Sequence, residues 1–130
     1  MLDTDTCVFI LRRTSDAVLT KIQTVPVAQQ VMSVVTYAEL LYGVQLATKK
    51  KSNQAAVEAL VRYLAVLEWP QSAAQHCAEI RADLKKKGSM IGANDLLIAA
   101  HARSLGAVVV TNNTKDFTRV KGLRIENWLN

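Results

Sequence analysis

The run AVVVT at residues 107–111 is the feature that most constrains the fold of this chain. It places three valines in a row, without the apolar–polar alternation of a strand that has one face in water. So short a continuous apolar run is typical of a strand buried on both faces, as in a parallel sheet covered by helices. A second apolar and β-branched run, at residues 31–35, makes the same prediction.

Helical spacing of apolar residues separates these runs along the chain. The pattern predicts strands at residues 1–4, 31–35, 107–111 and 123–126, with a short one near 66–68. It predicts helices at 6–12, 15–24, 36–47, 52–67, 72–87 and 92–105, and a short helix or turn at 114–120. This alternation favours an α/β fold with a mostly parallel central sheet. Because no repeat or linker interrupts it, residues 1–130 are interpreted as a single domain.

The composition favours a globular protein that works in a reducing compartment. Half of the residues are hydrophobic and 21% are charged. Two cysteines, Cys7 and Cys77, are too few for a disulfide framework, which favours a cytoplasmic location. The longest uncharged stretch, residues 22–38, contains a proline and several polar residues, so we expect no membrane span. A net charge of +5 favours an anionic partner.

Four acidic residues occupy comparable places in the predicted fold. Asp3, Glu39, Asp95 and Asp116 each lie at the end of a predicted strand or in the first turn of a helix. Because ligands of parallel sheets bind outside the carboxyl ends of the strands, we expect these acids to gather at one rim. Carboxylates so close together repel one another unless cations or raised pKa values relieve them. Ligation by oxygen alone selects Mg²⁺ or Mn²⁺.

Each acid also has a purely structural explanation. Thr36 and Glu39 fit a capping box, and Asn94 is placed to cap the helix that contains Asp95. Asp3 fits the cap of the first helix, and the last acid fits a turn. These explanations compete with the metal site for each residue taken singly, whereas they do not explain why all four fall at one rim.

Other chemistries have little support in the sequence. His76 and His101 have no partner at the spacing of a zinc site, and we expect both on helix surfaces. Motifs for nucleotide phosphates, dinucleotides and serine hydrolases are absent from the sequence. Cys7 lacks a base and is interpreted as a core residue.

Basic residues form clusters that have two explanations. Arg12 and Arg13 form one, and two runs of three lysines form the others. Two of the three clusters fall at predicted carboxyl ends of helices, where cations offset the helix dipole. The functional alternative is nucleic acid, whose phosphates such clusters would hold. The candidate RNA-binding residues are Lys49, Lys50, Lys51, Lys85, Lys86 and Lys87.

Four segments, in this order and at this spacing, resemble the PIN-domain ribonucleases, and more narrowly the VapC toxins of bacterial toxin–antitoxin pairs. The closing segment, residues 122–128 (GLRIENW), is similar too. The four are residues 1–7 (MLDTDTC), 33–43 (SVVTYAELLYG), 91–100 (IGANDLLIAA) and 110–117 (VTNNTKDF).

The resemblance implies a three-layer α/β/α fold and a Mg²⁺- or Mn²⁺-dependent endoribonuclease. It also implies a homodimer and a cognate VapB-type antitoxin. The family's catalytic quartet falls on the four rim acids, with Asp3, Asp95 and Asp116 as metal ligands and Glu39 as a further candidate. Thr111 and Asn112 match supporting polar positions.

One departure from the family pattern lies beside the first acid. Relatives usually carry Asn where this chain has Asp5, which makes Asp5 a fifth candidate ligand or a helix-start acid. The opening segment and the TNN run are similar to the subgroup that cuts initiator tRNA in the anticodon stem-loop.

The expected chemistry is metal-assisted hydrolysis of an RNA phosphodiester, with in-line attack by water and products that carry 5′-phosphate and 3′-OH ends. Two alternatives belong to other classes: an RNA-binding PIN-like domain that is weak or inactive as a catalyst, and a Mg²⁺-binding receiver-type signalling domain. The receiver-type alternative lacks a suitably placed lysine, because Phe117 follows Asp116 and Lys121 is badly placed.

Overall fold

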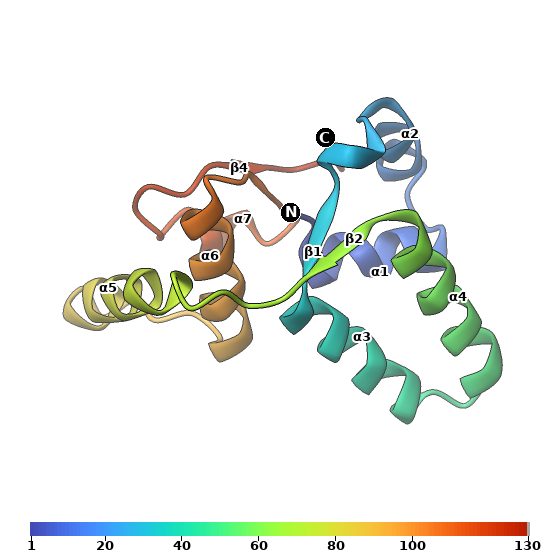
Figure 1. Ribbon diagram of the computed structural model, residues 1–130, viewed down its shortest axis with the longest axis horizontal. Coiled ribbons are helices and arrows are strands. Elements are labelled where there is room, and N and C mark those ends of the chain that lie inside the picture. The colour runs from blue at the N-terminus through green and yellow to red at the C-terminus, as the bar shows by residue number, and fades with distance from the viewer. Residues whose placement is uncertain (130) are drawn as a thin grey trace.

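A computed structural model describes residues 1–129 of the chain. Its short strands lie between two groups of helices: helices α1 to α4 lie to one side and α5 to α7 to the other (Figure 1). The helices are α1 (Thr4–Arg12), α2 (Asp16–Thr24), α3 (Val34–Leu46), α4 (Lys50–Tyr63), α5 (Ala73–Lys86), α6 (Ala93–Leu105) and α7 (Thr114–Phe117), with a 3₁₀ turn η1 (Val27–Gln29). The strands are β1 (Val31–Ser33), β2 (Ala65–Leu67), β3 (Val109–Val110) and β4 (Ile125–Glu126).

The strands form two parallel pairs that the start of the chain joins. Strand β1 pairs with β2, and β3 pairs with β4. Between the pairs lie residues 1–3: the amide of Leu2 donates to the carbonyl of Val31, and the amide of Asp3 donates to that of Val110. The predicted parallel sheet is confirmed, in the order β2, β1, residues 1–3, β3, β4.

Alternation along the strands divides the core into two layers. Met1 and Val109 pack with α5 and α6, whereas Leu2, Met32 and Val110 pack with α1 to α4. Successive strand residues point to opposite faces, so a short apolar run supplies both layers. Helices therefore cover both faces of the sheet, as the run at residues 107–111 predicts.

Several predicted boundaries were wrong, and local capping explains the observed starts of α1 and α3. Helix α1 begins at Thr4 because Asp3 caps it, its side chain accepting from the amide of Thr6 at 3.0 Å. Helix α3 begins at Val34 because Ser33, directly after β1, is the cap. Thr36 therefore lies buried inside α3, and the predicted capping box is not formed.

Two further predictions were wrong in the second half of the chain. Gly92, and not Asn94, is the cap residue of α6, and no side chain caps that helix. His101 is buried rather than on a helix surface. Its Nδ1 lies 2.8 Å from Ser33 Oγ, so it ties α6 to the start of α3. Cys7 is buried, as predicted.

Across residues 1–129 we find no helix with the length and hydropathy that crossing a bilayer requires.

Candidate functional site: a carboxylate rim

Four elements bring the predicted acids to one edge of the sheet. Asp3 ends the first strand segment. Glu39 lies in the second turn of α3, the helix that follows β1, and not in the first turn as predicted. Asp95 lies in the first turn of α6, and Asp116 lies in α7, after β3. The charges of Glu39, Asp5 and Asp116 all act on Asp95, so the structure brings these acids together.

Asp3 is the most deeply buried of the acids, with 2% of its surface exposed. Burial raises the pKa of Asp3 to about 6, although interactions with Thr111 and Thr6 oppose the rise. The nearby charge of Asp5 adds to it. Near neutral pH this carboxylate is an uncompensated charge in a buried place, which attracts a cation.

Asp95 and Asp116 are linked by one amide. Asn113 Nδ2 lies 3.0 Å from Asp116 Oδ2 and 3.3 Å from Asp95 Oδ2, so it donates to both. Arg119 Nη1 lies 3.6 Å from the other oxygen of Asp116. Burial, followed by the charges of Glu39 and the other acids, raises the pKa of Asp95 to about 6, and Asn113 opposes the rise.

A threonine also holds Glu39 in place at the rim. Thr4 Oγ1 donates to Glu39 Oε1 at 2.6 Å, and it lies 3.5 Å from Thr36 Oγ1. The side chain of Asp5 is largely exposed. Its pKa is nevertheless raised, first because part of the carboxyl group is desolvated and second by the nearby charge of Glu39. The fifth acid therefore adds to the repulsion at the rim.

The donor set of the rim fits a hard divalent cation. Its candidate ligands are all carboxylates, and burial together with neighbouring acids raises the pKa values of Asp3 and Asp95. Within residues 1–129, however, no three His, Cys, Asp or Glu side chains are already arranged around one point as a metal site.

Sequence reasoning did not single out Asn113, which lies between two acids. It also missed Thr4 and Arg119 as partners of rim carboxylates. The predicted supporting residue Thr111 is buried against Asp3, whereas Asn112 is exposed and accepts from Asn127 Nδ2 at 3.3 Å. The sequence places both Asn112 and Asn113 shortly before Asp116, and this spacing does not show which of the two contacts the rim acids.

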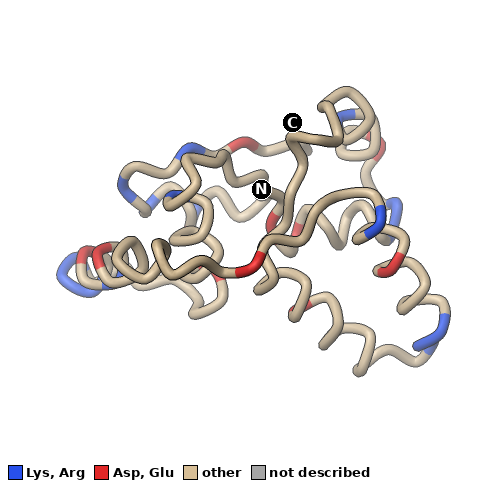
Figure 2. Tube along the Cα trace, in the orientation of Figure 1, with Lys and Arg blue, Asp and Glu red and all other residues tan. Residues whose placement is uncertain are grey.

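The two lysine runs lie at opposite kinds of helix end (Figure 2). Lys49 is the cap residue of α4, and Lys50 and Lys51 begin that helix. Lys85 and Lys86 lie in the last turn of α5, and Lys87 pairs with Asp83 at 3.0 Å. The helix dipole stabilises cations at a carboxyl end and opposes them at an amino end.

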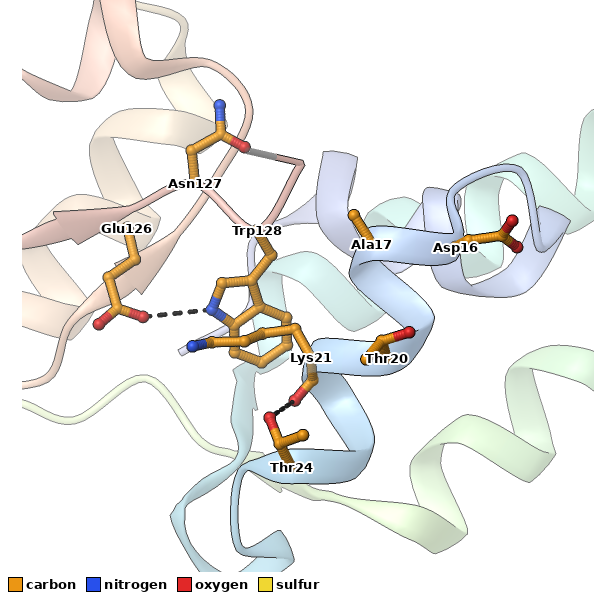
Figure 3. Close-up of a pocket in the computed structure, with 8 residues that line it drawn as sticks. All are labelled: Asp16, Ala17, Thr20, Lys21, Thr24, Glu126, Asn127 and Trp128. Atoms are coloured by element: carbon orange, nitrogen blue, oxygen red, sulfur yellow. Dashed lines mark hydrogen bonds between the residues drawn. The ribbon is translucent and has the colours of Figure 1, made fainter.

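A pocket of about 530 Å³ lies between α2 and the C-terminal segment (Figure 3). Trp128 forms part of its wall, with Nε1 donating to Glu126 at 3.2 Å. None of the predicted site residues lines this pocket.

Comparison with known proteins shows the family to which this chain belongs. A family model described as "PIN domain" matches residues 1–123. The "tRNA(fMet)-specific endonuclease VapC" of Salmonella typhimurium is 39% identical over 98% of this chain and 96% of its own length. "Ribonuclease VapC2" of Haemophilus influenzae is 37% identical over 99% and 97%. The chain belongs to the VapC ribonucleases of the PIN domain family.

Solved VapC-containing complexes have the same fold. The structure of DNA-bound VapBC from Salmonella typhimurium superposes with a TM-score of 0.91 at 39% identity, covering 98% of this chain and 96% of the matched chain. VapBC2 from Rickettsia felis, bound to a DNA fragment of its promoter, gives 0.91 at 35% identity, covering 98% and 97%. The resemblance found in the sequence and the predicted α/β PIN fold are confirmed, and the receiver-type alternative is excluded.

Proposed function

We propose that this protein is a divalent-metal-dependent endoribonuclease toxin that cuts tRNA, with initiator tRNA in its anticodon stem-loop as the favoured substrate. The observation that carries the proposal is the gathering of the acids at one rim, where the pKa values of Asp3 and Asp95 are raised to about 6. The substrate is proposed from the relative whose name specifies tRNA(fMet) and which matches almost the whole chain.

Asp3, Asp95 and Asp116 are the proposed ligands of Mg²⁺ or Mn²⁺, with Glu39 and Asp5 as further candidates. When bound, the metal would lower the pKa of water and neutralise charge on the phosphate under attack. The protein's own part is placement. Thr4 fixes one oxygen of Glu39, which leaves the other to orient or deprotonate the attacking water.

The second proposed role of the protein is to hold the remaining acids in place. Asn113 keeps Asp95 and Asp116 at a fixed spacing, and Arg119 offsets part of the charge of Asp116. Removing a group that orients a metal ligand typically lowers metal affinity or activity by about 10- to 100-fold.

Neither histidine is placed to activate the 2′-OH of RNA. His101 is buried against Ser33, and His76 Nδ1 accepts from Arg103 Nε at 2.9 Å. Attack by water is therefore favoured over attack by the ribose, and the products should carry 5′-phosphate and 3′-OH ends.

A VapB-type antitoxin is the proposed regulatory partner, since the relatives of known structure are VapBC complexes. An arginine of the antitoxin would bridge the rim carboxylates and displace the metal. An antitoxin helix would fill the apolar groove between α1, α2 and α4, which Ile10, Leu19, Leu60 and Tyr63 line. We also propose a homodimer, which light scattering after gel filtration would detect.

The test is cleavage of purified initiator tRNA with and without Mg²⁺, followed by sequencing of the RNA 5′ ends. We expect cuts in the anticodon stem-loop that depend on the metal and disappear in Asp95→Asn. RNA binding without cleavage at any metal concentration would instead support the inactive RNA-binding alternative.

A further inference from the structure

A groove of about 550 Å³ runs from the carboxylate rim to a cationic end between α1, α3 and α4. Thr4 and Glu39 line the end at the rim, and Arg12, Lys49 and Asn53 line the other end. The floor is apolar. It is formed by Val8, Leu11, Leu40, Val44 and Val57.

Of the two cations at the far end, Arg12 lies in the last turn of α1, where the helix dipole stabilises it, whereas Lys49 has no such explanation. Arg12 and Lys49 are exposed, and among the described residues neither has a carboxylate within ion-pair distance. Lys49 stands at the amino end of α4, where the dipole opposes a positive charge. The explanation that lysines merely offset a dipole therefore fails for Lys49.

The other lysines of the chain's two runs differ in surroundings. Lys50 and Lys51 line a separate hollow on the other side of the α3–α4 hairpin, together with Glu58. Lys85 and Lys86 lie at a helix carboxyl end, where the dipole stabilises them. Of the six lysines, only Lys49 lines the groove that leads to the rim.

We propose that this groove holds the RNA strand that leads to the scissile phosphate, with Arg12 and Lys49 contacting its phosphates. The inference rests on the proposed ribonuclease function and deepens it by naming the substrate path. The two cations at the far end of the groove match the phosphates of a polyanion, and the apolar floor suits ribose and base faces. A peptide carrying an arginine toward the rim would meet two like charges in the same groove, which favours RNA as the occupant.

The experiment compares two double variants in the Asp95→Asn background, so that the RNA survives. One is Arg12→Ala with Lys49→Ala, and the matched control is Lys50→Ala with Lys51→Ala. Fluorescence anisotropy measures the affinity for initiator tRNA and for a single-stranded RNA as salt is varied, and circular dichroism checks that each variant is folded.

The groove variant should bind RNA about 25-fold more weakly at 0.1 M salt, and its log–log salt slope should be shallower by about 1.4, since each single-strand contact contributes about 0.7. The control should keep the parent slope. In the catalytically competent protein, the groove variant should raise KM and leave kcat nearly unchanged.

An unchanged affinity and slope in the groove variant, with tRNA still cleaved by the unsubstituted protein, would overturn the inference and leave the proposed function standing. Equal losses in the control would also overturn it, because the effect would then reflect net charge. Retained RNA binding with lost antitoxin binding would assign the groove to the antitoxin. If the parent protein neither bound nor cleaved RNA, the proposed function itself would fail.

Discussion

The carboxylate rim and the cationic end of the groove are adjacent regions of opposite charge, built in opposite ways. The rim acids are held in place: Asp3 is buried, and Asn113 spans Asp95 and Asp116. Arg12 and Lys49 are long, exposed side chains without protein partners among the described residues. A buried charge interacts more strongly with nearby charges because the effective dielectric constant around it is low. An exposed cation can exchange its counterions for the phosphates of RNA. The rim should therefore govern the chemical step, and the groove should govern binding.

The largest effect is expected at the rim, where a substitution tests whether the rim governs the chemical step and the groove governs binding. Asp95→Asn keeps the shape of the side chain and removes a charge, so cleavage should fall at least about 100-fold, comparable to losing one electrostatic contact to the transition state. RNA affinity should stay the same or rise, since a charge that repels phosphate is lost. Single-turnover cleavage and anisotropy on one protein sample measure both.

The same variant should melt at a higher temperature than the parent in EDTA, because one of several mutually repelling charges is removed. Full cleavage activity in Asp95→Asn would contradict the catalytic assignment, and a loss of RNA binding equal to the loss of cleavage would break the division between the two regions.

The rim should also make metal binding depend on pH. The folded-state pKa values of Asp3 and Asp95 are raised to about 6, so both carboxylates bind protons in the range where they would otherwise hold a cation. Below pH 6, metal affinity should fall by up to about tenfold per pH unit for each protonated ligand. Calorimetric titration with Mn²⁺ between pH 5 and 7.5 measures this change.

The stability of the metal-free protein should change in the opposite direction. A carboxyl with a raised folded-state pKa binds more protons when folded than when unfolded, so its contribution makes the fold more stable as pH falls from about 6 toward 4. In the calorimetric titration, a metal affinity that stays constant between pH 5 and 7.5 would show that Asp3 and Asp95 are not ligands.

A smaller effect is expected at Asn113. Asn113→Leu removes the amide that donates to both Asp95 and Asp116. We therefore expect metal affinity to fall about 10-fold, at the lower end of the range for groups that orient metal ligands. Asn112→Leu is the matched control, since within residues 1–129 the side chain of Asn112 forms a hydrogen bond with Asn127 and none with a rim acid. RNA affinity should be unchanged in both variants. Equal effects at the two asparagines would contradict the role of Asn113.

The smallest expected effect sharpens the contrast between the lysine runs. Replacing Lys85, Lys86 and Lys87 by alanine should lower the free energy of unfolding by a few tenths of a kcal/mol, because dipole compensation at the end of α5 and the exposed ion pair of Lys87 with Asp83 are lost. Replacing Lys49–Lys51 should leave it unchanged or raise it by a similar amount. Urea unfolding of both triple variants measures the difference, and equal destabilisation would contradict the dipole argument.

The rim could be predicted from the sequence because the position of each acid depends only on the strand or helix that contains it. Asp3, Glu39, Asp95 and Asp116 follow strands or open helices, and parallel strands end at one edge, so their gathering follows from the order of the elements. The four motifs then resembled one family, and the comparisons confirm that assignment. The roles of the individual acids stay predictions.

Contacts between distant segments were beyond prediction. The burial of His101 depends on Ser33, 68 residues away, and the role of Asn113 depends on α6, which the sequence does not place beside it. Local ambiguity explains the capping error, since Ser33 and Thr36 are both good cap residues and only the true end of β1 decides between them. The contrast between the lysine runs likewise required the observed start of α4 at Lys50.

The most direct test of the central claim is the chemistry of the cut ends. Initiator tRNA is incubated with the purified protein in Mg²⁺ or EDTA, beside Asp95→Asn, and the product termini are determined. We predict cleavage only in Mg²⁺ and only by the unsubstituted protein, leaving 5′-phosphate and 3′-OH ends. Cleavage that persists in EDTA or in Asp95→Asn, or that leaves a 2′,3′-cyclic phosphate, would contradict hydrolysis by the carboxylate rim.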